Sequence, residues 1–182
     1  MEVSQCLSCT VGVLTEARSF YILESIHGQT MEKAWDSMSS KDRAQVCSEL
    51  QTCVSNLRWL RQDPQDPFIE LYITNQFMAE AGPFQSVKAL HDWFIFLCRR
   101  PMTDPHSIPI EPFRSELPDN AAITFTHGDL HRSNIILSES EPQRIVAIVD
   151  WEQSGWMPEY WEARKAHFTS AWKSEWLLNI CQ

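Results

Sequence analysis

The chain has 182 residues, 43% of them hydrophobic, with eight Trp and a formal net charge of −9. This composition excludes a globally disordered chain. The acidic balance argues against a nucleic-acid partner, because phosphate backbones are bound by clustered Lys and Arg. The length favours one domain, or one large lobe with a small appendage.

The sequence contains no signal for secretion or membrane insertion. The first nine residues lack a basic start and a long apolar stretch, and no apolar run of about 18 residues occurs anywhere. The six Cys are scattered without a disulfide framework. We therefore expect a cytoplasmic protein in a reducing compartment, with no membrane partner.

Residues 9–26 predict a hairpin of two strands. Val11 and Val13 alternate with small or polar residues before a polar turn, and Phe20 and Ile22 follow it. Because an isolated hairpin is marginal in water, we expect this one to lean on a larger unit. Gly28 closes the hairpin, and a short helix is expected over residues 30–35.

Two amphipathic helices are predicted next. The first is capped by Ser39 or Ser40 and ends before Asp63-Pro64. Its apolar stripe consists of Ala44, Cys47, Leu50, Val54, Leu57 and Leu60. The second runs from a cap at Ser86 to Pro101, and it is followed by a proline-rich extended loop over residues 101–118.

The C-terminal part predicts a small β-hairpin and a final helix. A strand over residues 122–125 leads into the loop 127–134, and strands over 135–137 and 145–149 follow. The 145–149 strand is almost wholly apolar, so we expect it to be buried on both faces. Pro158 is expected in the first turn of the final helix.

Three oxygen-bearing side chains converge at one end of this hairpin. Asp129 and Asn134 stand in the loop, and Asp150 ends the return strand. Carboxylate and amide oxygens suit Mg²⁺, which bridges phosphate oxygens. Asp129 then remains free to orient and deprotonate a hydroxyl nucleophile, as in the protein-kinase pattern H-R-D-x-x-x-x-N.

The motifs are similar to those of a known family. The run HGDLHRSN at 127–134, followed by IVDWE at 148–152, resembles the aminoglycoside phosphotransferase and choline kinase family of kinase-like enzymes. Phrases such as LRQDPQDPF, HDWF and PEYWEARKA are most similar to its fungal members of unassigned substrate. The likeness covers nearly the whole chain from about Tyr21 onward.

This resemblance implies a fold. It predicts an α+β chain whose main part, residues 28–182, is a protein-kinase-like C-terminal lobe, mainly helical with a small β-hairpin that carries the site. Residues 1–27 would form the hinge and a two-stranded remnant of the N-terminal lobe.

The resemblance also implies roles for single residues. Asp129 would be the catalytic base, with His127 bracing its loop in the catalytic group, and Asn134 and Asp150 would bind Mg²⁺. His131 and Arg132 would lie near the phosphates or the substrate. The adenine of ATP would meet the hinge backbone, at Leu23, Glu24, Ser25 and Ile26.

The sequence departs from the family before the hinge. The family's N-terminal lobe supplies a phosphate-covering loop and a lysine for the α- and β-phosphates, but Lys33 is the first lysine here and no Gly-rich loop exists. Three explanations stay open: a shortened chain, a non-catalytic binding or regulatory module, and a chain that works with a protein partner supplying the missing half. The resemblance favours an enzyme, a phosphotransferase with an alcohol group as acceptor, while the missing ATP-covering lobe leaves open whether this chain alone is active.

Other interpretations concern the substrate and the metal. The acceptor is expected to be a small molecule with a hydroxyl group, and the acidic composition mildly favours a cation. Trp151, Trp156, Trp161 and Trp172 could form a cation–π cage for a quaternary amine, although core packing is the favoured interpretation. His127, Asp129 and His131 could instead bind a transition metal in a hydrolase, which would leave Asn134 and Asp150 without a common role.

Overall fold

The computed structural model describes a mixed helix-and-strand chain. The described residues are 10–14, 18–22, 25–65, 69, 82–101, 104 and 112–169. Their α-helices are α1 (Met31–Ala34), α2 (Ser40–Leu57), α3 (Val87–Arg99) and α4 (Trp161–Thr169). Four 3₁₀ turns accompany them: η1 (Trp35–Ser37), η2 (Pro112–Glu116), η3 (Arg132–Asn134) and η4 (Trp151–Gln153).

The strands form three small antiparallel sheets within the described residues. They are β1 (Thr10–Leu14), β2 (Arg18–Ile22), β3 (Gln29–Thr30), β4 (Ile123–Thr126), β5 (Ile135–Leu137), β6 (Ile145–Ile148) and β7 (Gly155–Pro158). The strand orders are β1-β2, β3-β5-β6 and β4-β7. The expected mixture of helix and strand is therefore confirmed, including the two hairpins β1–β2 and β5–β6.

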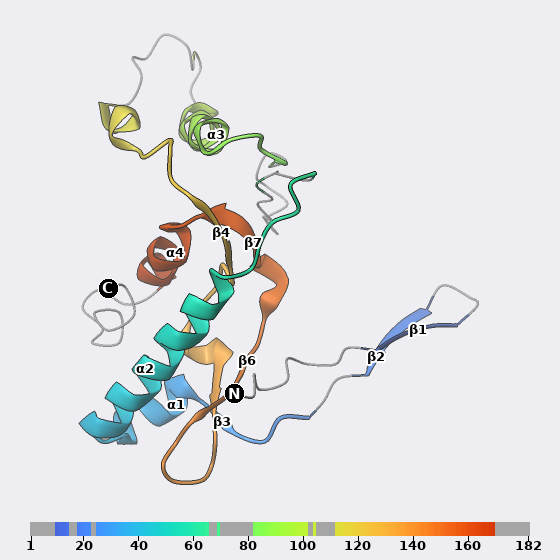
Figure 1. Cartoon of the computed structure of the whole chain (residues 1–182), viewed down its shortest axis with the longest axis vertical. Helices are drawn as coiled ribbons and strands as arrows, with labels where there is room; N and C mark the ends of the chain where they lie inside the picture. Colours follow the sequence, from blue (N-terminus) through green and yellow to red (C-terminus); the bar gives the residue numbers. More distant parts are fainter. Residues whose placement is uncertain are drawn as a thin grey trace.

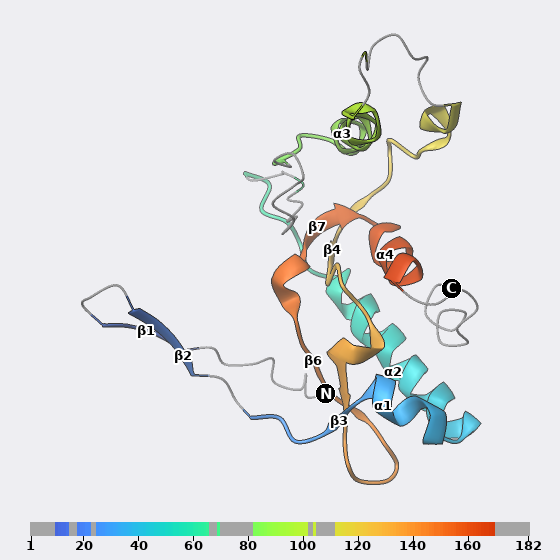
Figure 2. The same cartoon turned by 180° about the vertical axis from the view of Figure 1, so that it is seen from behind.

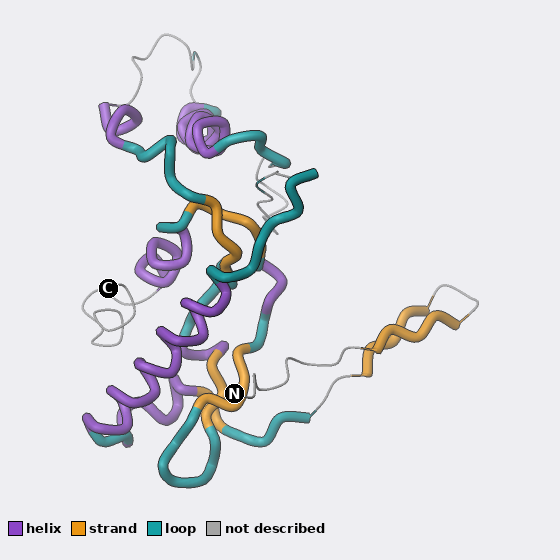
Figure 3. The backbone as a smooth tube through the Cα atoms, in the orientation of Figure 1, coloured by secondary structure: helices purple, strands orange, loops and turns teal. Residues whose placement is uncertain are grey.

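The elements are arranged along one long axis. Helix α3 and turn η2 lie at one end, and the β3-β5-β6 sheet lies at the other end with α1 and α2 (Figure 1). Strands β4 and β7 and helix α4 lie between these ends, as the reverse view also shows (Figure 2). The β1–β2 hairpin projects sideways from this body (Figure 3). The division of the chain into an N-terminal remnant with the hinge (1–27) and a C-terminal lobe (28–182) stays a prediction.

Side-chain caps explain where three helices begin. Thr30, Ser39 and Ser86 each accept a hydrogen bond from the amide three residues further on, at 3.4, 3.2 and 3.1 Å. The predicted caps at Ser39 and Ser86 are thereby confirmed, whereas Thr30, predicted as the first residue of its helix, is the cap that precedes it. The predicted extent of the helix capped by Ser39 was too long: α2 stops at Leu57, where the amides of Trp59 and Leu60 turn back to carbonyls three residues earlier. Leu60 consequently leaves the apolar stripe and is 49% exposed.

Two predictions about the C-terminal strands were also wrong. Strand β6 is not buried on both faces: Val146, the extra residue at an irregularity in its pairing with β5, is 44% exposed, whereas Ile145 and Ile148 pack against the core. Pro158 ends strand β7 opposite Ile123 instead of opening a helix. A strand end tolerates the missing N–H of Pro, and the helix begins after a further turn.

The buried apolar residues form two clusters on either side of the β4–β7 pair. The first joins α1, α2 and β5 and takes in Leu130 from the loop after β4. The second joins α3 and β7 through Leu90 and Met157. Leu130 thus anchors the loop between β4 and β5 in the first cluster, which restrains the loop backbone. In the described part of the chain, no helix is long and apolar enough to cross a membrane.

Candidate active site

The loop after β4 makes a turn that requires glycine. Gly128 has a positive φ of 78°, a backbone conformation that side chains disfavour. A Cβ atom at this position would lie 2.2 Å from the carbonyl oxygen of Gln153 in η4. The motif His-Gly-Asp thus contains its Gly because the loop backbone touches the segment that follows Asp150.

His127 is fully buried at 0% exposure and braces this turn from within. Its Nε2 lies 3.0 Å from the Val149 carbonyl oxygen, and its Nδ1 accepts the backbone N–H of Asp129 at 3.2 Å. These partners require a neutral ring with the proton on Nε2. Burial lowers the pKa of His127, partly offset by the bond to Val149 and by the charges of Asp129 and Asp150.

The carboxylate of Asp129 is tied to the amide of Asn134. Asn134 Nδ2 donates to the Asp129 carbonyl oxygen at 2.9 Å and to Asp129 Oδ2 at 3.2 Å. Its Oδ1 accepts the hydroxyl of Ser133 at 3.2 Å and, as a carbonyl oxygen with two lone pairs, keeps one acceptor site. The amide is therefore oriented with its nitrogen toward Asp129 and with ligand capacity left on its oxygen.

Asp150 follows the strand that pairs with this loop. The Val149 amide donates to the Asn134 carbonyl oxygen at 2.9 Å, so Asp150 is one residue beyond the point where the two strands meet. Asp150 is exposed and adopts a left-handed backbone with φ 67° and ψ 60°. Asp tolerates this region, but a single such residue often marks a functional position.

The remaining loop residues are also fixed locally. His131 Nδ1 accepts the Ser133 amide at 3.3 Å and so caps η3. The guanidinium of Arg132 lies over the ring of Trp35 in η1, with its carbon 5.5 Å from the ring centroid. The guanidinium carbon of Arg43 also lies over this ring, 5.1 Å from its centroid. The side chain of Arg132 thus reaches toward α1 and η1, and its nearness to a phosphate stays a prediction.

Glu162 is a functional residue that the sequence reasoning missed. It lies in the first turn of α4, is only 4% exposed, and accepts the backbone amide of His127 at 2.6 Å. It also accepts the amide of Gly128 at 3.3 Å. Burial raises the pKa of Glu162, while these two hydrogen bonds act in the opposite direction. An acidic residue in a first helical turn is commonplace, so only its burial distinguishes it.

The predicted hinge and the alternative metal site involve residues outside or beside this loop. The hinge residues Leu23 and Glu24 lie outside the described residues, while Ser25 and Ile26 lie in the loop before β3. Adenine binding there stays a prediction. A transition-metal site on His127 is disfavoured because both of its ring nitrogens are engaged. In the described residues, no three His, Cys, Asp or Glu side chains gather in a way that could hold a metal ion.

The described tryptophans do not gather around one space. Trp151 packs edge-on against His127 and Trp156 edge-on against Phe125, at centroid distances of 4.6 and 5.4 Å, while Trp161 stacks on Phe94 at 5.6 Å. Each indole thus belongs to a separate contact, as the core-packing interpretation expects. Trp172 lies outside the described residues.

Comparison with known proteins bears on the whole chain. A family model described as a phosphotransferase enzyme family matches residues 2–182. This match confirms the family resemblance inferred from the loop motif, and it covers the N-terminal segment as well. Among curated proteins, no sequence matches the chain.

Proposed function

Because the chain belongs to the phosphotransferase enzyme family, we propose that it transfers the γ-phosphoryl group of ATP to a hydroxyl group of a small molecule. Family membership supports phosphotransferase chemistry in general. The choice of ATP and of a small-molecule hydroxyl comes from the resemblance to the aminoglycoside phosphotransferase and choline kinase family, and the choice of Mg²⁺ also from the residues around Asp129. These choices are the part to be tested.

The contact between Asn134 and Asp129 carries this proposal. The amide nitrogen of Asn134 holds the Asp129 carboxylate at 3.2 Å, and the backbone of Asn134 pairs with Val149 at 2.9 Å, beside Asp150. A base, an amide oxygen and a second carboxylate are thereby attached to one loop and one strand end. This is the donor set that phosphoryl transfer uses.

Asp129 is the proposed general base. Asn134 donates a hydrogen bond to Asp129 Oδ2, and the backbone N–H of Asp129 donates to His127. These two bonds orient the half-buried side chain of Asp129. It would accept a hydrogen bond from the acceptor hydroxyl and take its proton as the oxygen attacks phosphorus. His127 would act as a brace that keeps the loop in this conformation.

The residues fit Mg²⁺ as a resident ion. Asn134 Oδ1 has spare acceptor capacity, and Asp150 presents an exposed carboxylate, so one amide and one carboxylate oxygen could hold an ion that retains several waters. When bound, the ion would neutralise charge on the transferred phosphate. A ligand set of this kind needs only one carboxylate, which explains why no cluster of three ionisable ligands is required.

The acceptor is expected to be a small hydroxyl compound rather than a nucleic acid. The net charge of −9 opposes an anionic polymer and favours a cationic acceptor. Its identity can be sought by adding ATP and Mg²⁺ with amino sugars, amino alcohols or polyols, and following ADP release.

The deciding experiment is binding of ATP with and without Mg²⁺, by calorimetry. We expect Asp150→Asn to abolish the Mg²⁺-dependent part of binding, and Asp129→Asn to retain binding but lose turnover. Glu139→Gln, an exposed change at the opposite end of the same hairpin, is the matched control. Binding that ignores both Mg²⁺ and Asp150→Asn would refute the proposal. Binding without turnover by the unaltered chain would instead favour the binding-module alternative.

A further inference from the structure

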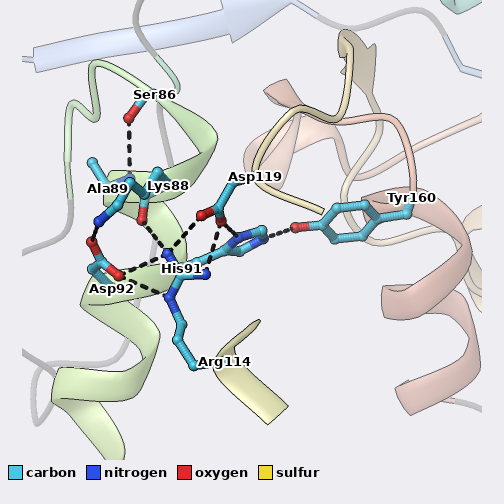
Figure 4. Close-up of polar contacts among 8 residues, drawn as sticks. All are labelled: Ser86, Lys88, Ala89, His91, Asp92, Arg114, Asp119 and Tyr160. Atoms are coloured by element: carbon cyan, nitrogen blue, oxygen red, sulfur yellow. Dashed lines mark hydrogen bonds and ion pairs between the residues drawn. The ribbon is translucent and has the colours of Figure 1, made fainter. Parts of the chain in front are cut away.

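A second polar centre lies away from the loop and is built around His91 in α3. His91 is 2% exposed, its Nδ1 lies 2.6 Å from Asp119 Oδ1, and its Nε2 contacts the hydroxyl of Tyr160 (Figure 4). The carboxylate can only accept, so Nδ1 carries a proton; in the neutral ring, Nε2 then accepts the Tyr160 O–H. The three side chains come from α3, from the turn before β4, and from the residue that precedes α4. We call them the latch.

The Asp119 end of the latch is anchored by a second set of charges. Arg114 holds both carboxylate oxygens of Asp119, at 2.9 and 3.0 Å, and its Nε donates to Asp92 at 2.8 Å (Figure 4). The hydrogen bonds from Arg114 and then from His91 lower the pKa of Asp119. Asp119 is therefore held as an anion in a fixed place, and His91 is oriented by it.

The Tyr160 end of the latch is the start of α4. The Tyr160 carbonyl accepts the Arg164 amide at 3.1 Å, which is the first helical hydrogen bond. The next residue, Trp161, stacks on Phe94 of α3 at 5.6 Å. His91 and Phe94 stand three residues apart, on one face of α3. Helix α3 thus holds the first turn of α4 at one polar and one aromatic contact.

The residue after Trp161 is Glu162, which binds the amides of His127 and Gly128. A displacement of the first turn of α4 would move this carboxylate relative to the loop. We propose that the latch positions the loop of residues 127–134 through Glu162, so that His91 and Tyr160 are positioning residues. The loop's catalytic role is taken from the proposed function, but the latch itself is inferred from contacts alone.

Hydrogen exchange at the amides of His127 and Gly128, measured on the full chain by NMR or mass spectrometry, tests this inference. Tyr160→Phe removes one oxygen atom, leaves His91 Nε2 without its donor, and should speed exchange at these two amides about tenfold. His91→Gln should do the same. Glu162→Ala removes the acceptor itself and sets the upper limit of the effect. Lys88→Ala breaks an exposed ion pair on the same helix and should change nothing.

The amides of α2 provide the internal reference. Faster exchange at the loop with unchanged exchange in α2 supports the latch. Equal acceleration in both places means a general loss of stability and overturns the inference, as does unchanged loop exchange in Tyr160→Phe and His91→Gln. Because no nucleotide is used, a protein that fails to bind ATP would sink the proposed function and leave this result standing.

Discussion

Within the described residues, His127 and His91 are both buried, at 0% and 2% exposure, and each has a partner on both ring nitrogens. The partners differ in kind. His127 is bonded to two backbone groups, the Val149 carbonyl and the Asp129 amide. His91 is bonded to two side chains, those of Asp119 and Tyr160.

The difference separates a fixed brace from an adjustable link. Backbone partners exist whatever the neighbouring side chains are, so they impose one neutral tautomer on His127 wherever the chain folds this way. Side-chain partners can be removed one at a time by mutation or altered by pH. His127 thus holds the loop directly, through contacts that substitutions of neighbouring side chains leave in place. His91 acts on the loop indirectly, through contacts that such substitutions can change.

Removing the brace should have the largest effect. His127→Ala leaves the Val149 carbonyl and the Asp129 amide without partners in a buried site and opens a cavity. We expect the free energy of unfolding to fall by about 2–4 kcal/mol, measured by urea denaturation. The exposed His27→Ala should change it by less than about 0.5 kcal/mol. An equal loss in both variants would contradict the assignment of His127 as a brace.

Removing the link should cost less. In His91→Leu the Asp119 carboxylate keeps both hydrogen bonds from Arg114, so only the Tyr160 hydroxyl loses its partner. We expect a loss of about 1–2 kcal/mol in the same denaturation experiment. A loss larger than that of His127→Ala would reverse the comparison between the two histidines.

The pH dependence of stability should sharpen the contrast at the loop. The folded state depresses the pKa of His127 below 6.5, so the stability from its neutral form is present above pH 6.5 and is lost as pH falls. It raises the pKa of Glu162 above 4.5, so that contribution is present below pH 4.5 and is lost as pH rises. Between pH 4.5 and 6.5, the contributions of His127 and Glu162 therefore change the free energy of unfolding in opposite directions as pH rises.

Glu162→Gln removes one of these slopes. We expect its free energy of unfolding to rise more steeply with pH between 4.5 and 6.5 than that of the unaltered chain, by at most about 1.4 kcal/mol per pH unit. Denaturation at three pH values measures this. Parallel curves for the two proteins would show that Glu162 does not titrate differently in the folded state.

The smallest effect is expected at Arg132, whose side chain contributes to holding the loop through a cation–π contact. Arg132→Gln removes the guanidinium from the ring of Trp35 and should cost about 0.5–1 kcal/mol in thermal denaturation. Arg61→Gln, at an exposed position, is the matched control. If the two variants melt alike, the contact with Trp35 contributes nothing to holding the loop.

Local chemistry explains the successful part of the sequence analysis. The predicted caps at Ser39 and Ser86 depend on a side chain and an amide three residues away, so a short window contains the whole signal. The loop motif is similarly local, since Asp129 and Asn134 meet across five residues. The pairing that brings Asp150 near them follows from a hairpin with a short turn.

Apart from the end of α2, the missed features depend on distant partners. Pro158 lies in a strand because Ile123 pairs with it from 35 residues away, which overrides the local preference for a helix start. Glu162 reaches the loop across 35 residues, and His91 reaches Tyr160 across 69. Asp119 is held by Arg114, five residues away, but also by His91, 28 residues away.

From the sequence by itself came the family, the starts of α2 and α3, the strand pair β5–β6 and the residues proposed for catalysis, because each depends on residue types at short spacings. Only the tertiary structure decided which buried carboxylate supports the loop, which tautomer His127 adopts and what surrounds His91. Those properties arise from desolvation and from contacts between residues far apart in the chain, and neither is present until the two core clusters have packed.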